Sequence, residues 1–183
     1  MHEEIIISGF GGQGVMLLGK FLSEAAMEEN KQVSWLPSYG PEMRGGTANC
    51  HVIISDEPIA SPVIVESTML VAMNRPSLEK FQKTIKKGGA LFINSSIIDI
   101  DTDRSDVIVY KIPVNDIASK IGSQKIINMV MCGAMIQAKK LVSIDTMINV
   151  FKENLTGSKE KFIDLNIAAL KEGMKYFSEN YKS

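Results

Sequence analysis

The sequence predicts an α/β fold, because short apolar runs typical of strands alternate with stretches whose apolar residues recur at helical spacing. A glycine-rich segment directly follows the first apolar run, as in strand–turn–helix units of parallel sheets. From Val114 onward the pattern is helical. We therefore expect a three-layer α/β/α arrangement with a mostly parallel sheet, a Rossmann-like N-terminal half and a helical C-terminal part. The 183 residues are expected to form a single domain, 1–183.

The first third of the chain contains the elements around this glycine-rich segment. Apolar runs and turn residues predict strands over residues 3–8, 32–35 and 47–55, a helix over residues 12–29 and a loop over residues 36–46. The next apolar run, residues 59–66, contains Pro62. It is therefore expected to form either an edge strand or an extended loop.

The remaining elements are predicted in the same way. Pro76 is expected to start a helix that runs to about Lys87, where Gly88 and Gly89 end it. The Gly133–Ala134 pair would allow a close helix neighbour. We expect strands over residues 69–73, 90–94 and 106–112, and helices from residue 114 that include segments 143–155 and 159–181.

Composition and charge argue against several classes of protein. Hydrophobic residues make up 45% of the chain and charged residues 22%, as in ordinary soluble proteins. A formal net charge of −1 gives no support for binding to nucleic acid or to an anionic membrane surface. No apolar run reaches bilayer-spanning length, and no signal peptide precedes the first strand. We expect a cytoplasmic protein that binds neither nucleic acids nor membranes.

Potential metal ligands are few. The chain has two cysteines, Cys50 and Cys132, and two histidines, His2 and His51. An iron–sulfur cluster normally takes four thiolates, and a structural zinc site takes several Cys or His ligands. Cys50 and His51 are neighbours in an expected strand, so their side chains should point to opposite faces of the sheet. We expect no metal site in this chain, and any redox metal in its chemistry would lie in another chain.

The most informative motif is Gly9-Phe10-Gly11-Gly12-Gln13-Gly14. Backbone N–H groups without helical partners and the dipole of the following helix attract anions to such a turn. Gly9, Gly11 and Gly14 also match the G-x-G-x-x-G spacing of dinucleotide-binding proteins. Two interpretations stay open at this point. The glycines form an anion-binding turn, or they only permit a tight turn and close packing.

A nucleotide site would also need an acidic residue at the end of the second strand, to hold the ribose hydroxyls. No Asp or Glu stands there. Glu28 and Glu29 have a suitable sequence distance, but they fall at the end of the first predicted helix and are expected to face solvent. An NAD site is therefore the weaker interpretation of the glycine motif.

A second group of polar residues lies in the loop after the second strand, Ser38 to Gly46. It contains Tyr39 and Arg44, and in a parallel sheet this loop would lie beside the glycine turn. Arg44 is able to clamp a phosphate or carboxylate in a bidentate manner. Alternatively, Glu42 and Arg44 pair with each other or with a facing chain, and the loop is part of an interface.

Motifs of catalysis are absent from the sequence. It has no G-x-x-x-x-G-K-[ST], no G-x-S-x-G and no Cys–His pair with an orienting third group. No general base or nucleophile accompanies Arg44. The chain is therefore expected to be a binding or docking module without catalytic residues of its own.

The two motifs taken together resemble the gamma subunit of 2-oxoacid:ferredoxin oxidoreductases. The resemblance is carried by Ile7-Ser8 with the glycine motif, by Ser38 to Thr47, and by Val71-Ala72-Met73-Asn74 with Pro76-Ser77-Leu78. Pyruvate, 2-oxoglutarate, branched-chain (ketoisovalerate) and indolepyruvate enzymes share this module. A 2-oxoacid such as 2-oxoglutarate or pyruvate is the substrate that we expect.

The resemblance implies a division of labour among subunits. Such complexes oxidatively decarboxylate a 2-oxoacid with coenzyme A and pass two electrons to ferredoxin or flavodoxin. Thiamine diphosphate, Mg and the iron–sulfur clusters are expected in alpha, beta and, in some members, delta subunits. The present chain lacks a thiamine-binding Gly-Asp-Gly stretch and cluster cysteines. Whether the isolated chain homodimerises is left open.

For this chain, the resemblance implies a structural or cofactor-access role. Gly9, Gly11, Gly12, Gln13 and Gly14 are expected to lie near coenzyme A or at a subunit interface. Tyr39 and Arg44 are expected to lie with them. The alternative is an independent Rossmann-type nucleotide-binding enzyme.

Overall fold

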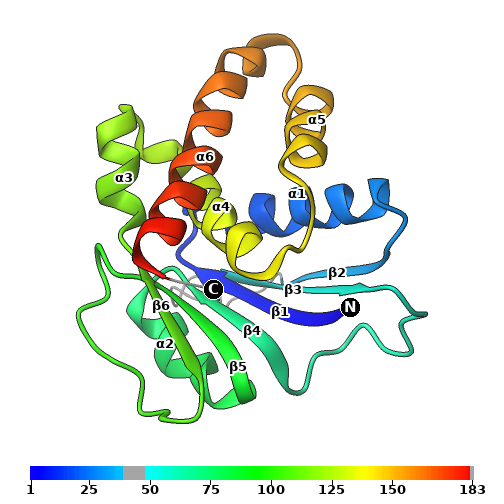
Figure 1. Cartoon of the computed structure of the whole chain (residues 1–183), viewed down its shortest axis with the longest axis vertical. Coiled ribbons are helices and arrows are strands. Elements are labelled where there is room, and N and C mark those ends of the chain that lie inside the picture. The colour runs from blue at the N-terminus through cyan, green and yellow to red at the C-terminus, as the bar shows by residue number, and fades with distance from the viewer. Residues whose placement is uncertain (39–47, 182–183) are drawn as a thin grey trace.

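The computed structural model describes residues 1–38 and 48–181. These residues form one six-stranded sheet with helices on both faces (Figure 1). The strands are β1 (His2–Gly9), β2 (Gln32–Ser38), β3 (Ala48–Ser55), β4 (Ser67–Ala72), β5 (Ile85–Asn94) and β6 (Ile108–Ile112). The α-helices are α1 (Val15–Glu28), α2 (Arg75–Phe81), α3 (Val114–Ile121), α4 (Ile127–Lys139), α5 (Ile144–Asn154) and α6 (Ile163–Asn180).

The sheet is mixed, with the strand order β2-β3-β1-β4-β5-β6. Strands β1, β4, β5 and β6 are mutually parallel neighbours, whereas β3 runs antiparallel to both β1 and β2. Five of the six strands therefore point in one direction, which confirms the predicted mostly parallel α/β class. The strand β3 is the exception, and it separates β2 from β1.

The two faces of the sheet carry unequal cores. One core lies under α1 and the C-terminal helices, and Phe21, Phe92 and Phe151 are its largest buried side chains. The other core is smaller and lies under α2, whose Leu78 packs there with Leu70 and other strand residues. Figure 1 shows α2 alone on its side of the sheet, opposite the other labelled α-helices. The three layers are thus present, with one of them thin.

Two glycines bring α4 and α6 into backbone contact. A Cβ at Gly133 would overlap the carbonyl oxygen of Leu170, and a Cβ at Gly173 would overlap the carbonyl oxygen of Val130. Such contacts are open only to glycine, because any side chain would push the two helices apart. The close neighbour predicted for Gly133 is therefore α6.

Several predicted boundaries are wrong. The helix that starts near Pro76 ends at Phe81 instead of Lys87, and a short 3₁₀ turn, Gln82–Thr84, leads into β5. Gly88 and Gly89 lie inside β5, where Gly88 has φ +77°. The register with β4 shifts over this stretch, which is typical of a bulge. The glycines thus permit a strand irregularity and do not end a helix.

Other boundaries differ by less. The second strand continues past Trp35 to Ser38, because β2 is an edge strand and tolerates Pro37. The last helix begins at Ile163, after a 3₁₀ segment, Gly157–Phe162. Residues 59–66 form a loop, one of the two predicted alternatives. Ser143 caps α5 through a 3.1 Å hydrogen bond from Thr146 N–H, and the helix begins at Ile144, next to the predicted residue 143.

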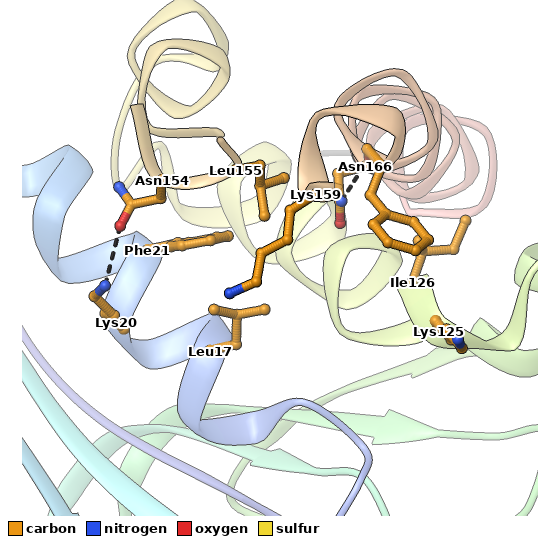
Figure 2. Close-up of a pocket in the computed structure, with 10 residues that line it drawn as sticks. Leu17, Lys20, Phe21, Lys125, Ile126, Asn154, Leu155, Lys159 and Asn166 are labelled. Atoms are coloured by element: carbon orange, nitrogen blue, oxygen red, sulfur yellow. Dashed lines mark hydrogen bonds between the residues drawn. The ribbon is translucent and has the colours of Figure 1, made fainter. Parts of the chain in front are cut away.

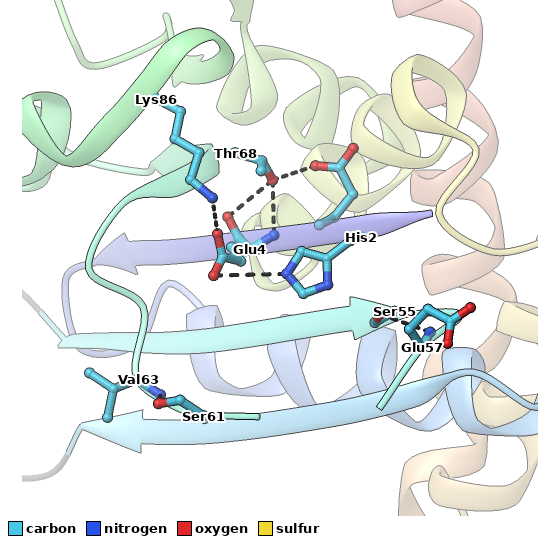
Figure 3. A network of polar contacts seen from close by, with 9 residues as sticks. His2, Glu4, Ser55, Glu57, Ser61, Val63, Thr68 and Lys86 are labelled. Carbon is cyan, nitrogen blue, oxygen red and sulfur yellow. Dashed lines mark hydrogen bonds and ion pairs between the residues drawn. The ribbon is translucent and has the colours of Figure 1, made fainter. Parts of the chain in front are cut away.

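The amino ends of the central strands are joined by polar contacts (Figure 3). Glu4 N–H in β1 donates to Thr68 Oγ1 in β4 at 2.9 Å, and the Thr68 hydroxyl donates to Glu3. Lys86 of β5 pairs with the Glu4 carboxylate. These contacts fix the relative positions of β1, β4 and β5 at the end of the sheet that lies opposite the glycine turn. None of the described helices is long and apolar enough to cross a membrane.

Candidate functional site

The glycine turn lies where the chain leaves the sheet in two directions. From β1 the chain continues into α1 on one face, and from the neighbouring β4 it continues into α2 on the other face (Figure 1). In open α/β sheets, ligands bind outside the carboxyl ends of strands at such a switch point. The carboxyl ends of β1 and β4 are Gly9 and Ala72. The predicted motif therefore stands at the position in the fold where a site is expected.

Backbone conformation explains two of the glycines. Gly12 has φ +91° and Gly14 has φ +73°, both in the left-handed region that favours glycine. Gly14 is the N-cap of α1, and the helix begins at Val15 rather than at the predicted residue 12. The predicted helix start is wrong because the motif is a complete turn in itself, closed by a hydrogen bond from Gln13 N–H to Phe10 O of 3.2 Å.

The side chain of Gln13 fills the switch point. Its Oε1 accepts from Phe10 N–H at 2.6 Å, and its Nε2 donates to the carbonyl oxygen of Met73, just after β4, at 3.0 Å. The same carbonyl accepts a 3.2 Å hydrogen bond from Nδ2 of Asn94, the last residue of β5. The ends of three parallel strands are thus tied together by two side-chain amides.

Packing explains the outer glycines of the motif. A Cβ at Gly9 would lie 2.6 Å from Gln13 Oε1 and 2.8 Å from Met73 Cβ. A Cβ at Gly14 would lie 2.5 Å from Nδ2 of Asn128, which donates to Gly14 O at 3.1 Å. Close packing, one of the two interpretations of the motif, therefore accounts for these two positions.

Gly11 differs from its neighbours. Its φ is outside the left-handed region, and no described atom lies within 4 Å of where its Cβ would be. Neither backbone conformation nor packing within the described chain requires glycine here. Gly12 also faces open space, and the Phe10 side chain between Gly9 and Gly11 is 43% exposed. The outer part of the turn is a bare backbone surface beside an exposed aromatic ring.

The second predicted group, Tyr39 and Arg44, lies outside the described residues. The flanking residues are placed: Ser38 is the end of β2, and Ala48 starts β3 in register with Gly9. The segment between them therefore starts and ends at the same edge of the sheet as the glycine turn. It connects two antiparallel neighbours, although a parallel connection was expected.

The topology is unfavourable for a dinucleotide. In the Rossmann arrangement the second strand lies beside the first and supplies the ribose-binding acid. Here β3 separates them, and no acidic residue ends β2.

The two glutamates at the end of α1 differ in their surroundings. Glu28 is exposed as expected, but Glu29 is not fully in solvent, because its Oε1 accepts from Ser143 N–H at 2.6 Å at the start of α5. Glu29 therefore has a structural role.

The cysteines are inert. Cys50 and Cys132 are fully buried, and burial raises the pKa of each thiol to about 12. Cys50 lies in the core beneath α1, whereas His51 lies on the opposite face, half-buried, where burial lowers the pKa of its imidazole. Among the described residues no group of His, Cys, Asp or Glu is arranged to hold a metal ion.

The sequence did not reveal three residues of the site. Met73 contributes its carbonyl, Asn94 its amide, and Asn128 its contact with Gly14. For Asn94 a signal existed, because a polar residue at the carboxyl end of a buried strand is typical of site positions. A carbonyl and a distant helix residue leave no such pattern.

Comparison with known proteins identifies the family. Residues 4–176 match the family of pyruvate ferredoxin/flavodoxin oxidoreductases. The chain is 36% identical over 183 residues to the 2-oxoglutarate synthase subunit KorC of Methanocaldococcus jannaschii, covering 98% of this chain and 96% of that protein. It is 38% identical over 177 residues to the ketoisovalerate oxidoreductase subunit VorA of Methanothermobacter thermautotrophicus, covering 95% of this chain. The chain spans only 36% of the length of that VorA subunit.

Solved structures of proteins with similar names have the same fold as this chain. The gamma subunit of a keto/oxoacid ferredoxin oxidoreductase from Geobacter sulfurreducens is 28% identical and superposes with a TM-score of 0.83, covering 97% of this chain and 99% of that one. A 2-oxoglutarate:ferredoxin oxidoreductase from Magnetococcus marinus, solved with 2-oxoglutarate, coenzyme A and succinyl-CoA bound, has the same fold. Its TM-score is 0.89 at 24% identity, covering 100% of this chain and 32% of that one. The resemblance inferred from the motifs is confirmed. The chain belongs to the pyruvate ferredoxin/flavodoxin oxidoreductase family, in which it is a gamma subunit of the 2-oxoacid:ferredoxin oxidoreductases.

Proposed function

We propose that this chain works in a complex that converts a 2-oxoacid and coenzyme A to an acyl-CoA. In this reaction the 2-oxoacid loses its carboxylate as carbon dioxide, the acyl carbon is oxidised and bonds to the thiol sulfur of coenzyme A, one proton is released, and two electrons reduce ferredoxin or flavodoxin. The names of the relatives favour 2-oxoglutarate, ketoisovalerate or pyruvate as the substrate. We place the complex in the cytoplasm.

The partners in this proposal are alpha and beta subunits and, in some assemblies, a delta subunit. They would hold thiamine diphosphate, Mg and the iron–sulfur clusters. The inert cysteines of this chain and its lack of a metal-binding group among the described residues support such a division. Residues 1–183 would act as one domain that contributes contacts and no catalytic side chain.

The single observation that supports a docking role is the combination of surroundings and backbone conformation at Gly11. Its neighbours in the motif are explained by the described residues, whereas Gly11 has an ordinary backbone conformation and no described atom within 4 Å of its Cβ position. A glycine at such a position is accounted for by the close approach of something outside the chain. We propose that a partner subunit or coenzyme A contacts the backbone at Gly11 and Gly12, beside the exposed Phe10 ring.

Other residues would complete this surface. Gln13 holds the turn in place through its two hydrogen bonds. The N–H groups in the first turn of an α-helix such as α1 suit an anion such as a phosphate of coenzyme A. Tyr39 and Arg44 stay in the proposal as further contacts. Without partners, the exposed Phe10 favours self-association of the isolated chain through this surface.

An independent nucleotide-binding enzyme is not favoured, because β3 separates β2 from β1 and Gln13 occupies the switch point. Calorimetric titration of the isolated chain with NAD, NADP, FAD and ATP tests this alternative. We expect no tight binding to any of them. Tight binding to one, or turnover of a 2-oxoacid by the isolated chain, would overturn the proposal.

The direct test is substitution at Gly11 in the complex. The tagged chain is co-expressed with candidate thiamine-binding and cysteine-rich subunits from the same genome, and 2-oxoacid- and coenzyme A-dependent reduction of ferredoxin is measured. Gly11→Val should leave the chain folded and reduce subunit recovery or raise the apparent KM for coenzyme A. Ala60→Val, at an exposed loop position, is the matched control and should change neither. Unchanged assembly and kinetics in Gly11→Val would contradict a role for this surface.

A further inference from the structure

A pocket lies in the helical layer, between α1, α5, α6 and the segment that precedes α4 (Figure 2). Its volume of about 320 Å³ is at the lower end of the range of small-molecule sites. Apolar side chains from four elements form its floor, and Phe21 and Ile126 are each only 1% exposed. Leu17, which is 40% exposed, adds accessible apolar surface beside this buried floor. Its described lining residues are Leu17, Lys20, Phe21, Lys125, Ile126, Asn154, Leu155, Lys159, Phe162 and Asn166.

The rim of this pocket is positively charged. Lys20 comes from α1, Lys125 from the 3₁₀ turn Gln124–Ile126 and Lys159 from the 3₁₀ segment before α6, and none of the ten described lining residues is acidic. Figure 2 shows Lys159 extending across the pocket toward Leu17 and Phe21. Lysines from three separate parts of the chain thus line one apolar cavity.

The three lysines differ in their partners. Lys20 Nζ donates to Asn154 Oδ1 at 3.0 Å and lies 3.4 Å from Glu24 Oε1, so its charge is partly neutralised. Lys125 lies 5.9 Å from the centroid of the Phe162 ring. Neither Lys125 nor Lys159 forms an ion pair with any residue that the structure describes. No described carboxylate therefore neutralises either of these two charges.

Asn166 adds a polar group at the wall. It is only 8% exposed, and its Nδ2 donates to Phe162 O at 2.7 Å. This bond fixes the orientation of the amide in the wall. The pocket thus combines an apolar floor, a cationic rim and a fixed amide, which is the pattern of a small-ligand site in which a few polar groups set the orientation.

We propose that this pocket binds a small organic anion with an apolar body, such as a medium-chain carboxylate. The apolar body would lie against Leu17 and Phe162, the apolar lining residues that are not buried, where its removal from water stabilises the complex. The carboxylate would accept a charge-assisted hydrogen bond from Lys159, and Lys125 would add positive charge at the rim. This site goes beyond the proposed docking role of the glycine turn and does not depend on it.

The ligand side of the proposal is tested with three probes on the full chain in solution. Octanoate supplies both the charge and the apolar body, octanamide only the body and acetate only the charge. Binding is followed by two-dimensional ¹H–¹⁵N NMR, in which the amides of Leu17, Ile126 and Leu155 should shift. Octanoate should bind at least about tenfold more tightly than either of the other probes, because only octanoate offers both the carboxylate charge and the apolar chain to the pocket. Equal affinity for octanoate and octanamide would overturn the proposal, as would shifts confined to other regions.

The protein side is tested by removing the two free charges. The double variant Lys125→Gln/Lys159→Gln should bind octanoate about tenfold more weakly or worse, with octanamide binding unchanged. The matched control is Lys152→Gln/Lys171→Gln, in which both lysines are exposed and outside the pocket lining. Both double variants should keep the thermal midpoint of the parent chain, since none of the four lysines is buried.

Two results would reject a small-molecule site. One is octanoate binding that is equal in both double variants. The other is an absence of octanoate binding together with loss of partner recovery in Lys125→Gln/Lys159→Gln alone, which would assign the pocket to an acidic segment of a partner subunit. Because the NMR measurement uses the chain without partners, it stands whether or not the docking role of Gly11 is correct.

Discussion

Gln13 and Met73 are joined by a 3.0 Å hydrogen bond that crosses from the turn after β1 to the residue after β4. The same glutamine accepts from Phe10 N–H at 2.6 Å, so one side chain both closes the glycine turn and attaches it to the neighbouring strand. The position at which doubly wound proteins usually hold a ligand is thereby occupied by the protein itself.

Removal of this side chain should loosen the turn. We expect Gln13→Ala to lower the free energy of unfolding by about 1–2 kcal/mol, because two hydrogen bonds are lost at a part-buried position. Urea denaturation measures the change, with Gln32→Ala at the exposed start of β2 as the control. Equal midpoints for the two variants would show that the Gln13 contacts contribute nothing.

The contact between α4 and α6 should not tolerate a methyl group. In Gly133→Ala the new Cβ would overlap the carbonyl of Leu170, and we expect a loss of about 3 kcal/mol in unfolding free energy. Gly11→Ala, which adds the same methyl group in open space, should stay within about 0.5 kcal/mol of the parent chain. A similar loss in both variants would argue against direct backbone contact.

Gly173 supplies the other half of this contact and allows a test of coupling. Once Gly133→Ala has separated the helices, the contact of Gly173 with Val130 is already weakened, so Gly173→Ala should add a smaller loss. The double variant should therefore lose clearly less than the sum of the two single losses. Additive losses, measured by the same denaturation experiment, would mean that the two glycines act at independent contacts.

Glu29 should make stability depend on pH in the acid range. Burial acts to raise its pKa, but hydrogen bonds from Ser143 N–H and Lys31 outweigh burial and hold the pKa below the ordinary value of 4.5. A lowered folded-state pKa means that the carboxylate stabilises the fold above 4.5 and that this contribution is lost as the pH falls through the folded-state value. Glu29→Gln should cost about 1 kcal/mol near neutral pH.

The measurement is the free energy of unfolding of parent and Glu29→Gln chains as a function of pH. The difference between them should be constant above 4.5 and shrink below it. Glu28→Gln, at the exposed neighbouring position, is the control and should show no such loss at neutral pH. A difference that grows on acidification would contradict the assigned sign.

Neither thiol should react in the folded chain. Both cysteines are buried, and burial raises the pKa of each thiol to about 12, so the reactive thiolate is scarce at about pH 8. We expect a disulfide reagent such as Ellman's reagent to titrate both thiols in denaturant and neither in the native protein. Rapid labelling of the native chain would show that one of them is accessible.

Local signals predicted much of the fold. The strand–glycine–helix order, the helix start near Ser143 and the close helix neighbour of Gly133 each have a local or pairwise physical cause, and each is observed. The end of the helix that follows Pro76 was not predicted correctly. Residues 82–87 carry helix-compatible side chains, but pairing of β5 with β4 outweighs their local preference.

Strand direction was the harder problem. Nothing in the residues of β3 distinguishes an antiparallel strand from a parallel one when both faces are buried, as they are here. For the site, the glycine turn was found because its chemistry is local. The partners of the turn, Met73 and Asn128, come from distant segments and become neighbours only through folding.

The edge strand β2 has a consequence for how copies or partners can join. Pro37 is the last but one residue of its ladder with β3 and supplies no N–H group. A strand that added to β2 would find no backbone hydrogen-bond donor at this position. Proline on edge strands is one of the features that limit sheet extension in proteins. Addition of a further strand at the carboxyl end of β2 is therefore disfavoured.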